Sequence, residues 1–140
     1  MNKQAIAERT AEIIEREDRA SRWLGIKRLE VRPGYARLAM RVTDDMVNGQ
    51  SVCHGGLIFA LADSSFGFAC NSHNQHALAA SCSIDFLAPA QLGDELTAEA
   101  LEAAHTGRTR IYDVRVTDQA GELIALFRGK SALVKGVWVE

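Results

Sequence analysis

A pair of glycines followed by an acidic residue is the feature of this sequence that most suggests catalysis. Gly55 and Gly56 open a strongly apolar segment, and Asp63, eight positions after Gly55, is the only charged residue within it. Backbone amides at the start of a helix stabilise negative charge, whereas a carboxylate on an apolar helix is costly to bury unless it has a role. We therefore predict an acyl-transfer site in which the Gly55 amide polarises a carbonyl and Asp63 supplies or activates the nucleophile.

The segment that carries both groups is expected to form one long central helix over residues 55–71. Its side chains are apolar on nearly every side, which is typical of a helix that is buried all round. The apolar run of residues 55–70 contains Asp63 and is shorter than the ~20 residues of a membrane span. The helix is therefore predicted to lie inside a folded domain, and no membrane association is expected.

The elements before the central helix are predicted to be an N-terminal helix and a β-hairpin. The helix is expected over residues 1–22, where apolar positions recur at helical spacing at Ile6, Thr10, Ile13 and Ile14. Residues 25–30 and 35–42 flank Pro33-Gly34, which suits a turn, and the second segment alternates as a half-buried strand does. Residues 43–53 are rich in Asp, Asn, Gly and Ser and are expected to form a loop.

The second half of the chain is predicted to consist of strands, at residues 77–87, 95–104, 108–117 and 122–134. The last three are joined by glycine-containing connectors that suit hairpin turns. Alternation in the first strand places Cys82, Ile84 and Phe86 on one face and Ser81, Ser83 and Asp85 on the other. The element order is an α+β layout, which predicts one domain over residues 1–140 with a curved antiparallel sheet wrapped around the central helix.

Composition and charge narrow the possible classes of protein. The chain is 47% hydrophobic and 24% charged, as ordinary globular proteins are, and its net charge of -2 argues against a dedicated nucleic-acid binder. The N-terminus is too charged for a signal peptide, and three cysteines without C-x-x-C spacing are typical of reduced thiols, so a cytoplasmic location is expected. Cys53 is interpreted as a packed thiol. His73 and His76 are interpreted as loop histidines without a third ligand, so no metal site is predicted.

Several short motifs together resemble one known family. They are Asn48, residues 54–56 (HGG), 61–63 (LAD), 81–86 (SCSIDF) and 127–131 (FRGKS). From residue 20 to residue 136 the sequence is similar to the hotdog-fold acyl-CoA thioesterases, and most of all to the hydroxyphenylacetyl-CoA thioesterases of bacterial phenylacetate degradation. The resemblance implies a hotdog fold and hydrolysis of aryl-acetyl or hydroxyphenylacetyl coenzyme A, with no cofactor other than the CoA that is part of the substrate.

The resemblance also assigns roles to individual residues. Asp63 matches the catalytic carboxylate, and Gly55 matches the residue whose N–H polarises the thioester carbonyl. His54 and Asn48 match positions that orient the thioester, and Ser83 matches a strand residue that helps to place the attacking water in some relatives. Asp63 would either draw a proton from water or attack the carbonyl to form a mixed anhydride, and the sequence leaves both routes open.

Two pairs of basic residues are candidates for binding the CoA portion of the substrate. Arg128 and Lys130 lie two positions apart on a predicted strand and so share one face. Either that face is a solvated surface or it contacts the CoA phosphates, and Arg108 and Arg110 present the same alternatives. Gly56 is a further candidate, because close approach of a ligand to the backbone favours glycine.

The spacing of Gly55 and Asp63 also predicts an oligomer. Eight residues of helix rise ~12 Å, which an Asp side chain cannot bridge, so one thioester cannot touch both groups of the same helix. A two-fold dimer with antiparallel helices solves this, with Asn48, His54 and Gly55 from one subunit and Asp63 and Ser83 from the other. We therefore predict a homodimer with two shared sites, and the resemblance implies that such dimers pair into a homotetramer.

Two other functions would use the same features. A hotdog acyl-thioester dehydratase or hydratase would use Asp63 to move a proton at the acyl carbons and would release no free thiol. A non-catalytic acyl-CoA-binding module would keep the pocket but would need no acid, and the presence of Asp63 argues against it.

Overall fold

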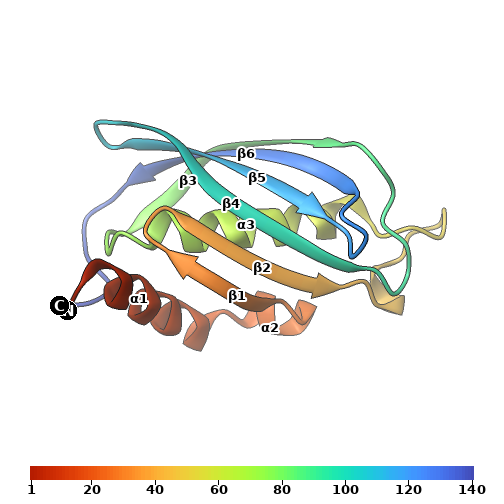
Figure 1. The fold of residues 1–140 in the computed structure, drawn as a ribbon, viewed down its shortest axis with the longest axis horizontal. Helices are drawn as coiled ribbons and strands as arrows, with labels where there is room; N and C mark the ends of the chain where they lie inside the picture. The colour runs from red at the N-terminus through yellow and green to blue at the C-terminus, as the bar shows by residue number, and fades with distance from the viewer.

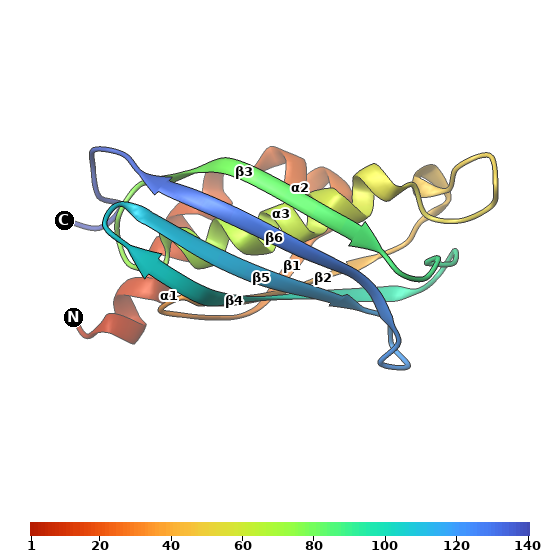
Figure 2. The ribbon, with the colours of Figure 1, turned by 90° about the horizontal axis from the view of Figure 1, so that it is seen from above.

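The long helix α3 (Gly55–Asn71) lies along the concave face of a six-stranded antiparallel sheet in the computed structural model, which describes residues 1–140 (Figure 1). The strands are β1 (Lys27–Arg32), β2 (Tyr35–Arg41), β3 (Ala77–Phe86), β4 (Glu95–Thr106), β5 (Thr109–Thr117) and β6 (Leu123–Leu133). Their order in the sheet is β1-β2-β4-β5-β6-β3. Figure 2 shows β4, β5, β6 and β3 side by side across α3, with β3 at the edge. The predicted α+β hotdog architecture is thus confirmed.

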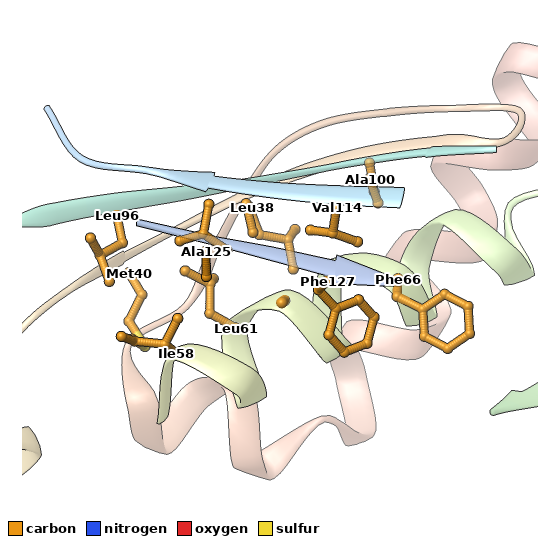
Figure 3. Packing of buried hydrophobic residues seen from close by; sticks show 14 of the residues in the cluster. Leu38, Met40, Ile58, Leu61, Phe66, Leu96, Ala100, Val114, Ala125 and Phe127 are labelled. Carbon is orange, nitrogen blue, oxygen red and sulfur yellow. The ribbon is translucent and has the colours of Figure 1, made fainter. Parts of the chain in front are cut away.

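The core forms where α3 packs against the sheet (Figure 3). Ile58, Leu61 and Phe66 of α3 are at most 3% exposed. They lie among apolar side chains of the strands, which include Leu38, Met40, Leu96, Val114, Ala125 and Phe127. The hydroxyl oxygen of Ser65 lies 3.0 Å from the carbonyl oxygens of both Ala36 and Ala98 and so joins α3 to β2 and β4. These contacts fix the rotation of α3 and leave the flank that carries Asp63 only partly covered.

The N-terminal helix predicted for residues 1–22 is two helices, α1 (Lys3–Glu17) and α2 (Arg19–Leu24). The break is at Asp18, whose backbone leaves the helical region and whose carboxylate accepts hydrogen bonds from the amide and the hydroxyl of Ser21. An Asp in this position caps a new helix, because its side chain satisfies amides that have no partner within the helix. The prediction of one continuous helix was wrong, since the spacing of apolar residues does not reveal a cap between two helices.

The hairpin and the loop before α3 agree with the prediction. β1 and β2 are joined at Pro33-Gly34, where Gly34 has a φ of 75°, a value that favours glycine in such a turn. The loop after β2 contains one short 3-10 helix, η1 (Asp44–Met46), and is held by isolated bridges between Val47 and Cys53 and between Val52 and Gln91. None of the helices combines the length and the apolar character that crossing a membrane requires.

The edge strand β3 is the part of the sheet that this chain leaves incomplete. β3 is hydrogen-bonded to β6 on one side and has no neighbouring strand on the other. Near its two ends, Leu78 is 63% exposed and Phe86 is 52% exposed. A long, unpaired edge with exposed apolar side chains is a surface on which another chain can add a strand.

Candidate active site

The start of α3 presents a backbone amide that has no partner in the chain. His54 is the N-cap residue, and its Nδ1 atom accepts a hydrogen bond from the Gly56 amide at 2.9 Å. The His54 amide in turn donates to the carbonyl oxygen of Met46, which anchors the cap. The amide of Gly55 donates to no group of the protein. An unsatisfied N–H at a helix N-terminus is suited to bind a carbonyl oxygen on which negative charge develops.

Asn48 shapes the loop that leads to this cap. Its Oδ1 atom accepts hydrogen bonds from the amides of Gln50, at 2.9 Å, and Val52, at 3.4 Å. The Asn48 amide donates to the Val52 carbonyl oxygen, so both ends of the loop are held together. Because the side-chain oxygen is occupied in this way, the Asn48 side-chain NH₂ group remains the part of the residue that can donate to a ligand.

Asp63 lies in the third turn of α3 as a half-buried carboxylate without an ion-pair partner. Its single polar side-chain contact within the chain is Cys82 of β3, with 4.0 Å between Sγ and Oδ1. Burial raises the pKa of Asp63 above that of an ordinary aspartate, because removal from water disfavours the charged form. A carboxylate of raised pKa is a stronger proton acceptor, which suits a general base.

Ser83 does not share a face with Asp63. Along β3, Cys82 and Ile84 are half-buried toward α3, whereas Ser83 is exposed on the opposite face of the sheet. Ser83 pairs in register with Arg128 of β6, which is also exposed. The structure therefore does not bring Ser83 to the Asp63 carboxylate of the same chain, and the expectation that the two act together needs correction. The physical reason is the strict alternation of side chains along a strand.

Gly55 and Asp63 are also kept apart within one chain. α3 is continuous from Gly55 to Asn71, so the two groups are separated by eight residues of regular helix. That spacing corresponds to a rise of ~12 Å along the helix axis. The structure thus places the amide and the carboxylate on one helix but does not bring them to one substrate atom within a single chain.

An apolar hollow adjoins Gly55. Its volume is about 320 Å³, and its walls are mostly hydrophobic. The lining residues are Val52, Cys53, Gly55, Ile58, Phe86, Leu87, Ala88, Pro89 and Ala90. Phe86 was not predicted as a site residue, although alternation in its strand placed it on the same face as Cys82 and Ile84. An apolar hollow beside the residue whose amide is free has the character of a site for an acyl group.

The basic residues proposed to bind CoA lie elsewhere. Arg128 and Lys130 are exposed on the outer face of the sheet, and Arg128 makes a bidentate ion pair with Asp113, at 2.7 and 2.9 Å. Arg108 donates to the Leu133 carbonyl oxygen at 2.8 Å. Arg110 donates to Glu102 at 2.6 Å and lies 3.1 Å from Nε2 of His73, just past the C-terminal end of α3. None of the four lines the hollow beside Gly55, and of the proposed substrate-binding residues only Gly56 lies at the start of α3.

Glu102 organises a polar cluster beyond the C-terminal end of α3. Its Oε1 atom accepts hydrogen bonds from Arg110 at 2.6 Å and Tyr112 at 3.0 Å, and lies 3.2 Å from Nε2 of His73. Burial by itself would raise the pKa of Glu102, but the hydrogen bonds from Arg110 and Tyr112 outweigh it and hold the pKa below the ordinary value. Burial and the neighbouring Arg110 lower the pKa of His73. The carboxylate of Glu102 is thus paired within this cluster, which lies away from the start of α3.

His76 and the buried cysteines are accounted for by packing. His76 stacks on the Trp138 ring at 4.0 Å between centroids, and its Nε2 lies 3.1 Å from the Val137 carbonyl oxygen. Cys53 and Cys70 are buried free thiols, and burial with the nearby charge of Asp63 raises the pKa of Cys70 to about 12. The interpretation of Cys53 as a packed thiol is confirmed, since it is 4% exposed. No three His, Cys, Asp or Glu residues are grouped as metal ligands would be.

Comparison with known proteins gives consistent matches in sequence. The profile of the thioesterase superfamily matches residues 50–125. The acyl-coenzyme A thioesterase PaaI of Escherichia coli is 44% identical over 120 residues, which are 85% of this chain and 85% of that protein. A putative esterase of Archaeoglobus fulgidus is 39% identical over 127 residues, which are 91% of this chain and 82% of that protein.

Solved structures match in the same way. The E. coli PaaI protein from the phenylacetic acid degradation operon superposes with a TM-score of 0.95 at 39% identity, over 97% of this chain and 99% of that one. The smu.793 protein of Streptococcus mutans, whose structure is bound to acetyl CoA, matches with a TM-score of 0.77 at 25% identity, over 80% of this chain and 90% of that one. Sequence and fold therefore agree that this chain belongs to the thioesterase superfamily.

Proposed function

We propose that this enzyme hydrolyses the thioester bond of acyl-CoA substrates that carry an aryl-acetyl group. The observation that carries the proposal is the unpartnered Gly55 amide at the start of α3, combined with the half-buried Asp63 carboxylate on the same helix. The proposal is supported by the 44% identity to an acyl-coenzyme A thioesterase and by the likeness to a protein bound to acetyl CoA. The aryl-acetyl preference is supported by the phenylacetic acid degradation operon of the E. coli relative.

The proposed site is shared between two subunits of a homodimer. A dimer is supported by the free edge of β3, the exposed Leu78 and Phe86, and the ~12 Å that separates Gly55 from Asp63 on one helix. With two α3 helices antiparallel, the N-terminus of each faces Asp63 of the other. Each site then takes Asn48, His54 and Gly55 from one subunit and Asp63 from its neighbour. Exposed Leu101 and Leu126 on the outer sheet face support pairing of two dimers into a tetramer.

Carbonyl polarisation is the first step of the proposed reaction. The thioester carbonyl oxygen accepts a hydrogen bond from the Gly55 amide, and the charge that develops on this oxygen is stabilised by the aligned amides of α3. Nδ1 of His54 is an acceptor toward Gly56, so the neutral ring carries its proton on Nε2 and can donate to the substrate. Coenzyme A leaves as a thiolate, which needs little acid assistance because thiol pKa values are near ~8.5.

Asp63 supplies the other half of the reaction by one of two routes. In the first it takes a proton from a water molecule that attacks the carbonyl carbon. In the second its carboxylate attacks the carbon and forms a mixed anhydride, which water then hydrolyses. Mass spectrometry of enzyme quenched during turnover distinguishes them, because only the second route leaves an acyl group on Asp63. Neither route uses a cofactor beyond the CoA of the substrate.

Release of free thiol from acyl-CoA tests the proposed function directly. Hydrolysis of phenylacetyl-CoA by the wild-type enzyme, monitored with a chromogenic thiol reagent, supports a thioesterase. Conversion of an unsaturated or hydroxylated acyl-CoA without release of thiol indicates a dehydratase or hydratase instead. Binding of acyl-CoA without any turnover indicates a non-catalytic binding module.

A further inference from the structure

Phe86, the last residue of β3, packs directly on the backbone of Gly55. A methyl group built on the Cα atom of Gly55 would lie 3.0 Å from Cζ, 3.3 Å from Cε1 and 3.5 Å from Cε2 of the Phe86 ring. The ring therefore covers the side of Gly55 on which any other residue would carry its side chain. Phe86 is nevertheless 52% exposed, so this contact leaves much of the residue uncovered within the chain.

The position of the ring is set by the backbone around it. Phe86 is paired in register with Ala125 of β6, and the next amide, of Leu87, donates to the Ile124 carbonyl oxygen at 2.8 Å. Further along the same wall, the Cys53 amide donates to the Ala90 carbonyl oxygen at 2.8 Å. The first of these hydrogen bonds joins the end of β3 to β6, and the second joins the segment after β3 to the loop that precedes α3. The hollow is thus built before any ligand enters, as binding sites usually are.

The hollow suits the acyl part of a substrate and not its phosphates. It holds about 320 Å³, and no charged side chain lines it. Gly55 and Phe86 both line the hollow, and the Phe86 ring lies against Gly55, so an acyl chain that fills the hollow lies beside the ring with Gly55 at its wall. Aromatic rings interact favourably at about 4.5–7 Å between centroids, beyond what apolar burial alone contributes.

We propose that Phe86 is the residue that determines specificity for flat aromatic acyl groups, because its ring forms the wall against which the acyl group lies when its carbonyl is bound at Gly55. The inference rests on the proposed thioesterase function and adds to it the group that selects the acyl chain. The thioester carbonyl is common to all acyl-CoA substrates, and Gly55 and Asp63 act on it whatever the acyl group, whereas the Phe86 ring distinguishes a phenyl group from a straight chain.

The test compares two substrates on each of three enzymes. Thiol release from phenylacetyl-CoA and from hexanoyl-CoA is measured for wild type, Phe86→Leu and Phe86→Tyr. We expect the ratio of the two kcat/KM values to fall about tenfold in Phe86→Leu, because leucine keeps the apolar volume but loses the ring. Phe86→Tyr, which keeps the ring, is expected to retain the ratio within about twofold. The ratio is independent of the fraction of correctly folded enzyme, so a partly unstable variant remains informative.

Leu29→Ala is the control, since Leu29 is an exposed apolar residue of β1 at the opposite edge of the sheet. Its ratio should equal that of wild type. An unchanged ratio in Phe86→Leu, including the case in which both kcat/KM values fall by the same factor, overturns the specificity role of Phe86. The thioesterase function is not affected by that outcome. A wild-type enzyme that hydrolyses hexanoyl-CoA but not phenylacetyl-CoA also overturns it. Failure of wild type to release thiol from either substrate overturns the thioesterase function itself.

Discussion

Nδ1 of His54 accepts the Gly56 amide at 2.9 Å, so one nitrogen of the imidazole caps α3 while the other remains free. A neutral imidazole that accepts a hydrogen bond at Nδ1 carries its proton on Nε2 and can donate from that atom. His54 directly precedes Gly55, whose amide has no partner in the chain. His54 therefore has a capping role in the structure and a donor role in the proposed reaction. These two roles can be separated by substitution.

His54→Asp should keep the cap and lose the donor, because a carboxylate accepts hydrogen bonds but does not donate them. Asp is a good N-cap residue, so the melting temperature should stay close to that of wild type, whereas His54→Ala should lose about 1 kcal/mol of unfolding free energy. Both variants should lose at least about tenfold in kcat, since a donor to the developing oxyanion is absent. Thermal unfolding and thiol release measure the two effects. Full activity in His54→Asp would show that the imidazole is needed only as a cap.

Asp63→Asn should abolish most turnover and leave the fold intact. The amide has the shape of the carboxylate but can neither accept a proton at neutral pH nor attack a carbonyl, so kcat should fall at least about 100-fold. Circular dichroism and size-exclusion chromatography should match wild type. A rate near that of wild type with phenylacetyl-CoA would remove Asp63 from the mechanism.

The same variant should alter the pH dependence of stability. Burial raises the pKa of Asp63 in the folded state, so the native protein binds this proton more tightly than the unfolded chain does. Stability is therefore lost as pH rises from the unfolded value of ~3.9 through the folded pKa. Asp63→Asn lacks this loss and should be at least as stable as wild type at pH 7. The difference in urea midpoint between the two proteins should shrink toward pH 4. A difference that grows toward pH 4 would contradict a raised pKa of Asp63 in the folded state.

Mixing two inactive variants tests whether the site is shared. In a dimer of one Asp63→Asn subunit and one His54→Ala subunit, one site carries both lesions and the other carries neither. Random exchange at equal amounts should therefore restore about a quarter of wild-type activity. Two preparations of Asp63→Asn mixed in the same way provide the control and should stay inactive. If mass spectrometry shows exchange but no activity returns, each site lies within one chain.

Removal of metal ions should leave the rate unchanged. The proposed reaction uses only the Gly55 amide, His54, Asn48 and Asp63, and no group of candidate metal ligands is present. Thiol release is measured before and after dialysis against a chelator, and again after addition of zinc. A rate that falls with the chelator and recovers with the metal would require a different mechanism.

The position of α3 and of the residues on it could be predicted because their relationship is local. The apolar run that starts at Gly55 marks the helix, and the spacing of Gly55 and Asp63 along it follows from helix geometry. The break at Asp18 was missed, since a cap between two helices leaves the apolar periodicity unchanged.

Local residue patterns were enough to predict the candidate reacting groups: an apolar helix that begins with glycines and carries one carboxylate, preceded by a histidine and an asparagine. Which side of each strand faces that helix, and which strand forms the free edge, follows from long-range packing of the chain. Alternation separates Ser83 from Phe86 along β3, and Arg128 and Lys130 from Phe127 along β6, but it does not say which face is the inner one. That depends on pairing with strands distant in sequence. The contact between Phe86 and Gly55 exists for the same reason. The two residues are 31 positions apart, and the packing of the end of β3 against the start of α3 brings them together.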